Sequence, residues 1–129
     1  MRFGYTILYV RDVPASLQFY EQAFSQRRRF LHESGQYAEL ETGTTTLAFA
    51  ARELAAQNLP GLVAPIDVGA PPPAFEVCFV SDNVPLAFAR AIDAGAIAVS
   101  EPQTKPWGQD VAYVRDRDGN LVEIASPVG

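Results

Sequence analysis

The chain has 129 residues and a mass of 14.0 kDa, which suits one small domain with its own core. Hydrophobic residues make up 48% and charged residues 19%, proportions that exclude a disordered or fibrous chain. The net charge of −5 argues against nucleic-acid binding, and no apolar run reaches the length of a membrane span. Because Cys78 is the single cysteine and no signal-peptide pattern opens the chain, we expect a cytoplasmic protein without disulfides.

Residues 5–24 are predicted to form a strand that leads into a helix. The strand alternates as far as Val10, and the helix carries an apolar face. Asp12 is placed to cap the helix, and Pro14 lies in its first turn, where proline costs no hydrogen bond. Three strand-like runs with turns between them follow, at residues 27–34, 36–42 and 44–51.

Residues 52–74 hold five of the ten prolines in the chain. This composition is typical of a linker on the surface, and residues 53–57 are predicted to form a short helix within it. A linker of this length can join two halves that pack within one chain or exchange across a dimer.

Residues 75–95 repeat the pattern of residues 5–24. Asp82 follows Asp12 at an offset of 70 residues, and Pro85 again stands at the start of a helical pattern. Three further strand-like runs come after this helix, at residues 96–101, 109–116 and 120–126.

This repeat predicts an α+β fold of two tandem βαβββ modules in a single domain. The first module takes residues 1–51, the linker residues 52–74, and the second module residues 75–129. Neither module has more than one long helix to cover its sheet, so each must pack against the other or against another chain.

The end of the chain carries the most specific motif. Residues 116–123 contain a D-x-D-G-N-x-x-E run, and a Trp-Gly-Gln run precedes it at residues 107–109. Together with the doubled module, these motifs resemble the vicinal oxygen chelate superfamily. That superfamily includes glyoxalase I, extradiol dioxygenases, fosfomycin-resistance enzymes and bleomycin-resistance proteins. The resemblance implies a homodimer, and a curved mixed sheet that folds around a cleft.

The resemblance also implies where a divalent metal would sit. In the superfamily, the ligands lie near the start of the first strand and on the last strand of each module. The offset of 70 gives Tyr5 and Phe75 at the first-strand positions, and aligning the hairpins gives Phe49 and Glu123 at the last-strand positions. Because three of these four residues are aromatic, and a catalytic metal needs about three protein ligands, we expect no metal and no other cofactor.

We therefore expect a small-molecule binding protein of the bleomycin-resistance type, which captures an aromatic and in particular a cationic ligand without turnover. Strand alternation places Val77 and Phe79 on the cleft face, together with the aromatic residues at the ligand positions. Cys78 is interpreted as a core residue, and His32 as a surface residue. Aromatic walls bind flat ligands by stacking, although the same rings on a sheet face can be plain core packing. The predicted ligand-binding residues are Tyr5, Tyr37, Glu39, Phe49, Phe75, Trp107, Tyr113 and Glu123.

Two alternatives remain at this point. In the first, the chain is a metal-dependent lyase or oxygenase with a non-standard site, in which Glu123 is joined by other donors. A bulge that turned Glu76 inward would favour this alternative. In the second, Glu123 acts as a metal-free acid or base, with its pKa raised among aromatic rings. The other candidate donors for the first alternative are Tyr5, Glu39 and His32.

Overall fold

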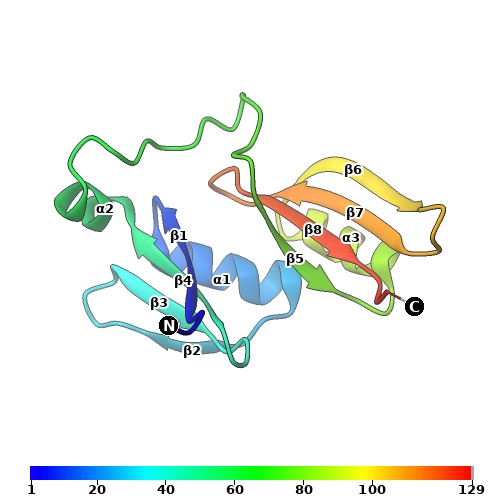
Figure 1. The fold of residues 1–129 in the computed structure, drawn as a ribbon, viewed down its shortest axis with the longest axis horizontal. Helices are drawn as coiled ribbons and strands as arrows, with labels where there is room; N and C mark the ends of the chain where they lie inside the picture. The colour runs from blue at the N-terminus through cyan, green and yellow to red at the C-terminus, as the bar shows by residue number, and fades with distance from the viewer. Residues whose placement is uncertain (129) are drawn as a thin grey trace. The chain divides into compact units, whose positions relative to one another are not determined.

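The computed structural model describes residues 1–128, which form eight strands and three helices (Figure 1). The strands make two separate four-stranded sheets, with orders β1-β4-β3-β2 and β5-β8-β7-β6, and each has one parallel and two antiparallel pairings. The predicted α+β fold of two βαβββ modules is therefore confirmed. The elements are β1 (Tyr5–Val10), α1 (Val13–Phe24), β2 (Arg28–Leu31), β3 (Tyr37–Leu40), β4 (Thr46–Ala51), α2 (Arg52–Asn58), β5 (Glu76–Val80), α3 (Val84–Asp93), β6 (Ile97–Thr104), β7 (Asp110–Arg115) and β8 (Leu121–Ala125).

The first compact unit comprises residues 1–21 and 25–65. Its sheet buries one face, where Leu8 of β1 pairs with Phe49 of β4 and the Phe49 ring lies 4.8 Å from that of Tyr20 on α1. The helix begins as the sequence predicts, because the Asp12 carboxylate accepts a hydrogen bond from the Ala15 amide at 3.1 Å. The opposite face carries Glu39 of β3 in one row with Ala48 of β4 and Ile7 of β1.

The second compact unit comprises residues 22–24 and 66–128. The face of its sheet that α3 covers buries small and branched residues, among them Val114 of β7 and Ile124 of β8. The N-cap of α3 is Asn83, whose side-chain oxygen accepts from the Leu86 amide at 3.1 Å. The expectation that Asp82 corresponds to the capping Asp12 is wrong, because the residue that caps is the next one along the chain.

The true offset between the modules is 71 residues, as the caps Asp12 and Asn83 show. The strand pairings agree: Ile7 faces Ala48 in the first sheet, and Cys78 faces Glu123 in the second. The offset of 70 is wrong by one residue, and such a slip moves every side chain of a strand to the other face.

The β3–β4 and β7–β8 hairpins also differ in length by one residue. Eight residues separate the paired Glu39 and Ala48, whereas nine separate the paired Tyr113 and Glu123. The longer turn is built around Asp116, whose carboxylate accepts from the amides of Asp118 and Asn120 and from the Asn120 side chain. The closing motif of the sequence therefore shapes this turn.

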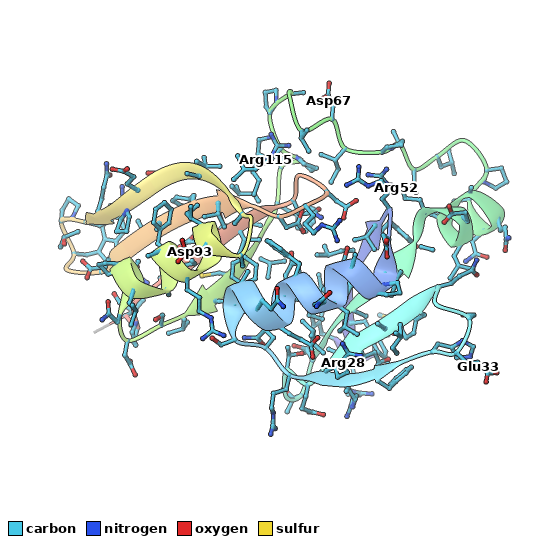
Figure 2. All side chains as sticks on the ribbon, turned by 180° about the vertical axis from the view of Figure 1, so that it is seen from behind. Arg28, Glu33, Arg52, Asp67, Asp93 and Arg115 are labelled. Carbon is cyan, nitrogen blue, oxygen red and sulfur yellow. The ribbon has the colours of Figure 1, made fainter. Side chains whose placement is uncertain are left out.

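Arg115 fixes the end of the linker to the second module. Its buried guanidinium donates to main-chain oxygens at distances of 2.6 to 3.4 Å, and Figure 2 labels it beside the segment that holds Asp67. Gly119 (φ +94°) has no space for a Cβ, which would lie 2.9 Å from both Arg115 Nη2 and Ile66 Cγ2. The linker is therefore anchored from residue 66 onward, and the predicted short helix is α2. The four oxygens belong to Asp67, Val68, Ala70 and Gly119.

Candidate functional site

The candidate site lies on the face of the second sheet that α3 leaves open. Cys78 on β5 pairs with Glu123 on β8, which pairs with Tyr113 on β7, so the three side chains form one row across the sheet. Glu76 lies two residues before Cys78 and therefore points to the same face. Four chemically active side chains thus share one surface of one module.

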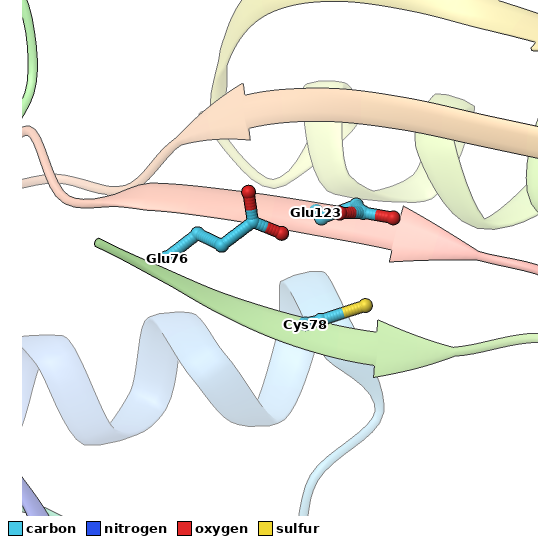
Figure 3. A group of neighbouring side chains, drawn as sticks. All are labelled: Glu76, Cys78 and Glu123. Carbon is cyan, nitrogen blue, oxygen red and sulfur yellow. The ribbon is translucent and has the colours of Figure 1, made fainter. Parts of the chain in front are cut away.

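Three of these side chains form a tight group. One donor atom each from Glu76, Cys78 and Glu123 lies within 4.8 Å of the other two. Figure 3 shows the Glu76 and Cys78 side chains rising from β5 toward the Glu123 carboxylate on β8. Glu76 and Cys78 are exposed and Glu123 is half-buried, so a ligand has access to the group.

The negative charges of the Glu76 and Glu123 carboxylates repel each other. The hydrogen bond that protonated Glu76 donates to the Glu123 carboxylate, together with partial burial and the charge of Glu123, raises the pKa of Glu76 to about 7. A proton on Glu76 avoids the repulsion that two ionised carboxylates in contact would suffer. A positive ligand would replace that proton and remove the repulsion.

The charges of Glu76 and Glu123 also affect the pKa values of the neighbouring Cys78 and Tyr113. Burial, followed by the charges of Glu123 and Glu76, raises the pKa of the Cys78 thiol to about 11, so the free thiol stays protonated at neutral pH. Burial and the same carboxylates also raise the pKa of Tyr113. Within residues 1–128, no basic side chain forms an ion pair with Glu76 or Glu123. The row is therefore an anionic surface without an internal counter-ion.

In the first module, the equivalent strand positions hold side chains of other types. The strand register places Tyr5, Ile7 and Ala48 where the second module has Glu76, Cys78 and Glu123. Tyr5 is exposed and Ile7 is apolar, while Ala48 offers only a methyl group. Within the first module, these positions supply one phenol and no carboxylate.

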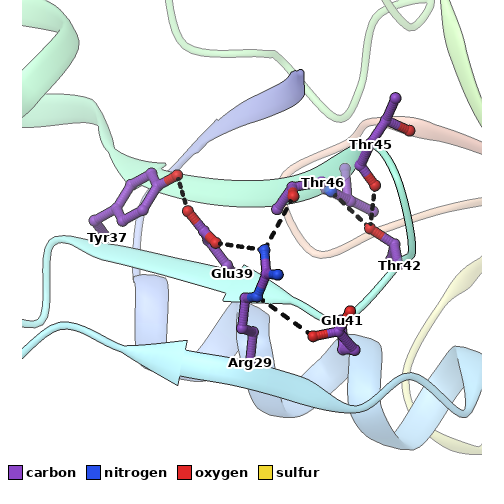
Figure 4. A network of polar contacts seen from close by, with 8 residues as sticks. Arg29, Tyr37, Glu39, Glu41, Thr42, Thr45 and Thr46 are labelled. Atoms are coloured by element: carbon purple, nitrogen blue, oxygen red, sulfur yellow. Dashed lines mark hydrogen bonds and ion pairs between the residues drawn. The ribbon is translucent and has the colours of Figure 1, made fainter. Parts of the chain in front are cut away.

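The carboxylate of the first module lies instead on β3, where its neighbours neutralise it. Glu39 is 7% exposed and accepts a 2.8 Å hydrogen bond from the Tyr37 hydroxyl (Figure 4). Arg29 lies 3.4 Å from the other oxygen of Glu39 and 3.3 Å from Glu41. Burial and the bond to Glu39 raise the pKa of Tyr37. Tyr37 and Glu39 lie together as predicted, but in a network with an arginine.

Phe49 and Phe75 do not occupy the strand positions that were predicted for them. Phe49 is 0% exposed and packs against Tyr20, so its alignment with Glu123 is wrong: the residue equivalent to Glu123 is Ala48. Phe75 precedes β5 and is 48% exposed, and Glu76 occupies the first-strand position that was assigned to Phe75.

The faces assigned to β5 are also reversed. Val77 and Phe79 belong to the covered side, where Phe79 stacks on Phe24 at 5.0 Å, and Cys78 lies on the open side. No bulge is needed to expose Glu76, because the pairing of β5 with β8 is regular from Glu76 to Val80. The prediction of Cys78 as a core residue is therefore wrong.

Trp107 and His32 lie outside the row. Trp107 sits in the β6–β7 turn, is 66% exposed, and donates its indole N–H to Gln109 at 2.9 Å. His32 is exposed and hydrogen-bonds to Ser34 at 2.7 Å, in agreement with its interpretation as a surface residue.

The missed residues are Glu76 and Cys78, and one sequence signal indicated them. Pro14 and Pro85 both occupy the start of a helix, and they are 71 residues apart. Aligning the modules on these prolines, in place of the two aspartates, pairs Tyr5 with Glu76 and brings Cys78 onto the open face.

The donor set of the second module fits the kind of metal ion that the superfamily holds. Glu76 and Glu123 occupy the first-strand and last-strand positions that the resemblance assigns to ligands, and Cys78 adds a third donor beside them. Carboxylate oxygen and thiolate sulfur are both ligands of zinc. The expectation of no metal placed Phe75 at the first-strand position that Glu76 occupies, so that residue no longer supports it, whereas Ala48, which takes the place of Phe49, is equally unable to bind a metal.

Comparisons with known proteins agree with the fold. A family model described as a glyoxalase-like domain matches residues 3–129, whereas no curated protein matches the chain. A glyoxalase-related enzyme from Fulvimarina pelagi is 20% identical, with a TM-score of 0.84 over 98% of this chain and 88% of that one.

A second solved structure is described as a glyoxalase/bleomycin resistance protein/dioxygenase family enzyme from Burkholderia phytofirmans PsJN. It is 23% identical, with a TM-score of 0.76 over 95% of this chain and 96% of that one. TioX from Micromonospora sp. ML1 is 22% identical, with a TM-score of 0.71 over 98% of each chain. Within residues 1–128, no helix is both long enough and apolar enough to cross a membrane. Since the family model spans nearly the whole sequence, this chain belongs to the glyoxalase-like domain family, within the vicinal oxygen chelate superfamily.

Proposed function

We propose that this chain is a small-molecule binding protein that captures a cationic aromatic ligand, such as a charged aromatic antibiotic, and acts by sequestration without turnover. This is the mode of action that the bleomycin-resistance type suggests. The observation that carries the proposal is the pair of adjacent carboxylates, exposed Glu76 and half-buried Glu123, which share one face and have no basic partner within residues 1–128.

The carboxylate pair would hold the positive group of the ligand. A cation placed between Glu76 and Glu123 displaces the proton of Glu76, and both carboxylates then accept charge-assisted hydrogen bonds from the cation or coordinate it directly. Tyr113 lies beside Glu123 in the same row and offers an aromatic surface to the remainder of the ligand. Charge and stacking would thus act on neighbouring parts of one small molecule.

Trp107 would supply a second aromatic contact. Its indole is largely exposed in the β6–β7 turn, and an exposed aromatic residue in a loop favours a role in recognition. We also propose a homodimer in the cytoplasm. The dimer follows from the superfamily resemblance, and the compartment follows from the single free thiol of Cys78.

An equilibrium titration with ethidium, an aromatic cation, tests the proposal. The aromatic anion anilinonaphthalene sulfonate serves as the comparison, and the fluorescence of the dyes reports binding. We expect the wild-type chain to prefer ethidium. The double variant Glu76→Gln/Glu123→Gln should bind it at least about tenfold more weakly, equal to about 1.4 kcal/mol.

Two variants complete the titration. Glu101→Gln removes an exposed carboxylate from β6 and should leave the affinity unchanged, whereas Trp107→Ala should weaken binding by about 1–3 kcal/mol. Equal affinity for the anion and the cation, or full affinity in the double variant, would refute the proposed cation site.

A second candidate function is a metal-dependent lyase or oxygenase. The observation that favours it is the third donor, Cys78, within 4.8 Å of both carboxylates. A divalent cation held there would supply Lewis-acid polarisation of a substrate oxygen. The chain itself would contribute the ligands and the neighbouring Tyr113 hydroxyl. Turnover of a glyoxalase or extradiol dioxygenase substrate by the metal-supplemented chain, lost in Glu123→Gln, would favour this function over capture.

A further inference from the structure

We propose that the end of the linker works as a latch that keeps the carboxylate pair of the second module vacant. Residues 66–70, the strap, hold the guanidinium of Arg115 and thereby prevent it from pairing with Glu123 and Glu76. This inference rests on the proposed role of Glu76 and Glu123 as cation-binding residues. It also explains why no basic side chain within residues 1–128 forms an ion pair with them.

Arg115 lies on the same face of the sheet as the carboxylates. It stands two residues after Tyr113 on β7, and Tyr113 is the cross-strand partner of Glu123 on β8. Arg115 and Glu123 are therefore diagonal neighbours, and such neighbours lie about 7–8 Å apart, within reach of a long side chain. In the described strands of the second sheet, β5 to β8, Arg115 is the only basic residue. It is therefore the internal cation that could block the pair.

The strap diverts the guanidinium of Arg115 from the carboxylates. Nη1 donates to the main-chain oxygens of Val68 and Ala70 at 3.0 and 2.6 Å, and Nη2 donates to that of Asp67 at 3.4 Å. Nε donates to the Gly119 oxygen at 2.9 Å. All three nitrogens of the guanidinium thus donate to main-chain oxygens, three of which belong to the strap.

The strap is folded into a turn that receives this cation. The Asp67 carboxylate accepts from the Gly69 amide at 2.8 Å, and the Asp67 main-chain oxygen accepts from the Ala70 amide at 3.0 Å. Because this turn is closed by its own hydrogen bonds, its carbonyl oxygens converge on Arg115 without any ligand. The strap is therefore a built acceptor for one guanidinium.

Packing holds the strap against the β7–β8 turn. A Cβ on Gly119 would lie 2.9 Å from Ile66 Cγ2 and 3.1 Å from Val68 Cγ1, so these two side chains lie directly on that turn. Three prolines at residues 71–73 then join the strap to β5, and proline restricts the backbone of this connection. Removal of the Ile66 and Val68 side chains should loosen the strap and leave Arg115 and the carboxylates in the chain.

The energies of the two alternatives favour the closed latch. Hydrogen bonds from a charged donor to buried main-chain oxygens are stronger than an ion pair near the surface. When the strap detaches, water takes over its carbonyl oxygens, and the acceptors nearest to Arg115 are the carboxylates on the same face. An external cation must then compete with Arg115. The pair therefore binds a cation best while the strap is closed.

Nuclear magnetic resonance of the Arg115 Nε–H group tests the latch without any ligand. The spectrum is recorded with and without the double change Glu76→Gln/Glu123→Gln. Both spectra are recorded in two backgrounds, the wild-type chain and the loosened chain Ile66→Gly/Val68→Gly. We expect the carboxylate change to leave the resonance in place in the wild-type background and to shift it in the loosened background.

A matched control changes the linker outside the strap. Leu62→Gly/Val63→Gly replaces two exposed apolar residues by glycine, as the loosened chain does, but at positions that do not touch Gly119. In this background the carboxylate change should leave the Arg115 resonance in place, as in the wild type. Circular dichroism shows whether each variant is folded.

The ethidium titration tests the consequence for binding. The loosened chain Ile66→Gly/Val68→Gly should bind ethidium about three- to fivefold more weakly than the wild type, because freed Arg115 competes for the carboxylates. Arg115→Met removes the competitor. This variant, alone or combined with the loosened strap, should bind ethidium at least as tightly as the wild type, whereas a strap with a merely structural role would weaken binding in all three chains.

A shift of the Arg115 resonance in both backgrounds, or in neither, would overturn the latch. Equal weakening of ethidium binding by the loosened strap with and without Arg115 would overturn it too. Failure of the wild type to bind ethidium rejects the proposed capture, and the resonance then decides the latch by itself. If Arg115→Met does not fold, the resonance test still holds because every chain in it keeps Arg115.

Discussion

The two modules have the same arrangement of strands and helix, but their carboxylates differ in burial and in whether they have a basic partner. In the first module, Glu39 is buried and satisfied by the Tyr37 hydroxyl and the Arg29 guanidinium. In the second, Glu76 and Glu123 face each other at an accessible surface, and within residues 1–128 no basic residue pairs with them. The same fold thus contains one neutralised carboxylate network and one charged pair that lacks a partner.

This difference indicates a structural role for Glu39 and suggests a binding role for Glu76 and Glu123. A buried carboxylate with its donors in place stabilises the sheet and has little left to offer a ligand. Two adjacent carboxylates that repel one another cost stability, and a bound cation would relieve that cost. The contrast is the reason for proposing the cation site in the second module, and the changes below test the contrast from the largest expected effect to the smallest.

Phe49→Ala should have the largest effect on stability. The ring is fully buried against Tyr20 in the first module, so its removal leaves a cavity and should lower the free energy of unfolding by about 3–5 kcal/mol. Denaturant unfolding measures this change. Trp107→Ala, at an exposed position, should stay within about 0.5 kcal/mol of the wild type. Similar stabilities for the two variants would contradict the assignment of Phe49 to the core.

Arg115→Met should release the linker from the second module. Loss of the charged hydrogen bonds to four main-chain oxygens should cost about 2–4 kcal/mol. Limited proteolysis, followed by mass spectrometry, should show new cleavage at residues 66–70. Arg117→Met, at an exposed position in the same turn, is the control. Protection of residues 66–70 in Arg115→Met would show that other contacts hold the segment.

Tyr37→Phe tests the neutralised network of the first module. The change removes the 2.8 Å hydrogen bond to the buried Glu39 carboxylate and should lower the free energy of unfolding by about 1–2 kcal/mol. Tyr5→Phe removes a hydroxyl from an exposed ring of the same module and should have almost no effect. An equally stable Tyr37→Phe variant would mean that Arg29 alone neutralises Glu39.

The smallest expected effect is the contribution of the Glu76–Glu123 pair to the pH dependence of the free energy of unfolding. The pKa of Glu76 is about 7 in the folded chain against an ordinary 4.5, so folding favours the protonated form. This contribution is complete below about pH 4.5 and is lost as the pH rises through 7. Glu76 is exposed, so we expect a loss of only about 0.2–1 kcal/mol.

Glu76→Gln should remove this contribution. Unfolding curves from pH 4.5 to 8 should show that the variant gains on the wild type as the pH rises, whereas Glu101→Gln should follow the wild type. A constant difference between Glu76→Gln and the wild type across this range would contradict the raised pKa of Glu76.

The fold was predictable because it depends on patterns that each module carries locally. The alternation along residues 5–10 predicts β1, in which Leu8 and Val10 are buried, and the prolines marked the starts of α1 and α3. The site was less predictable, because strand alternation has a period of two. The sequence alignment matched Asp82 with Asp12, although Asn83 is the cap. This error of one residue assigned Cys78 to the buried face and left Glu76 out of the predicted site.

Other features depend on partners that are distant in the sequence. Nothing near Glu39 in the strand pattern indicated that Arg29, on a neighbouring strand, would pair with it. Likewise, the pattern of β7 did not show that Arg115 would donate to the linker 45 to 48 residues earlier in the chain. Such contacts arise only when the whole module has folded.

The most direct test of the central claim is the affinity for ethidium measured side by side in three chains: the wild type, Glu76→Gln/Glu123→Gln, and Glu39→Gln. The account predicts that the double variant of the second module loses at least about tenfold in affinity. It also predicts that Glu39→Gln, once shown to be folded, binds ethidium like the wild type. Loss of binding in Glu39→Gln with full affinity in the double variant would contradict the account and move the cation site to the first module.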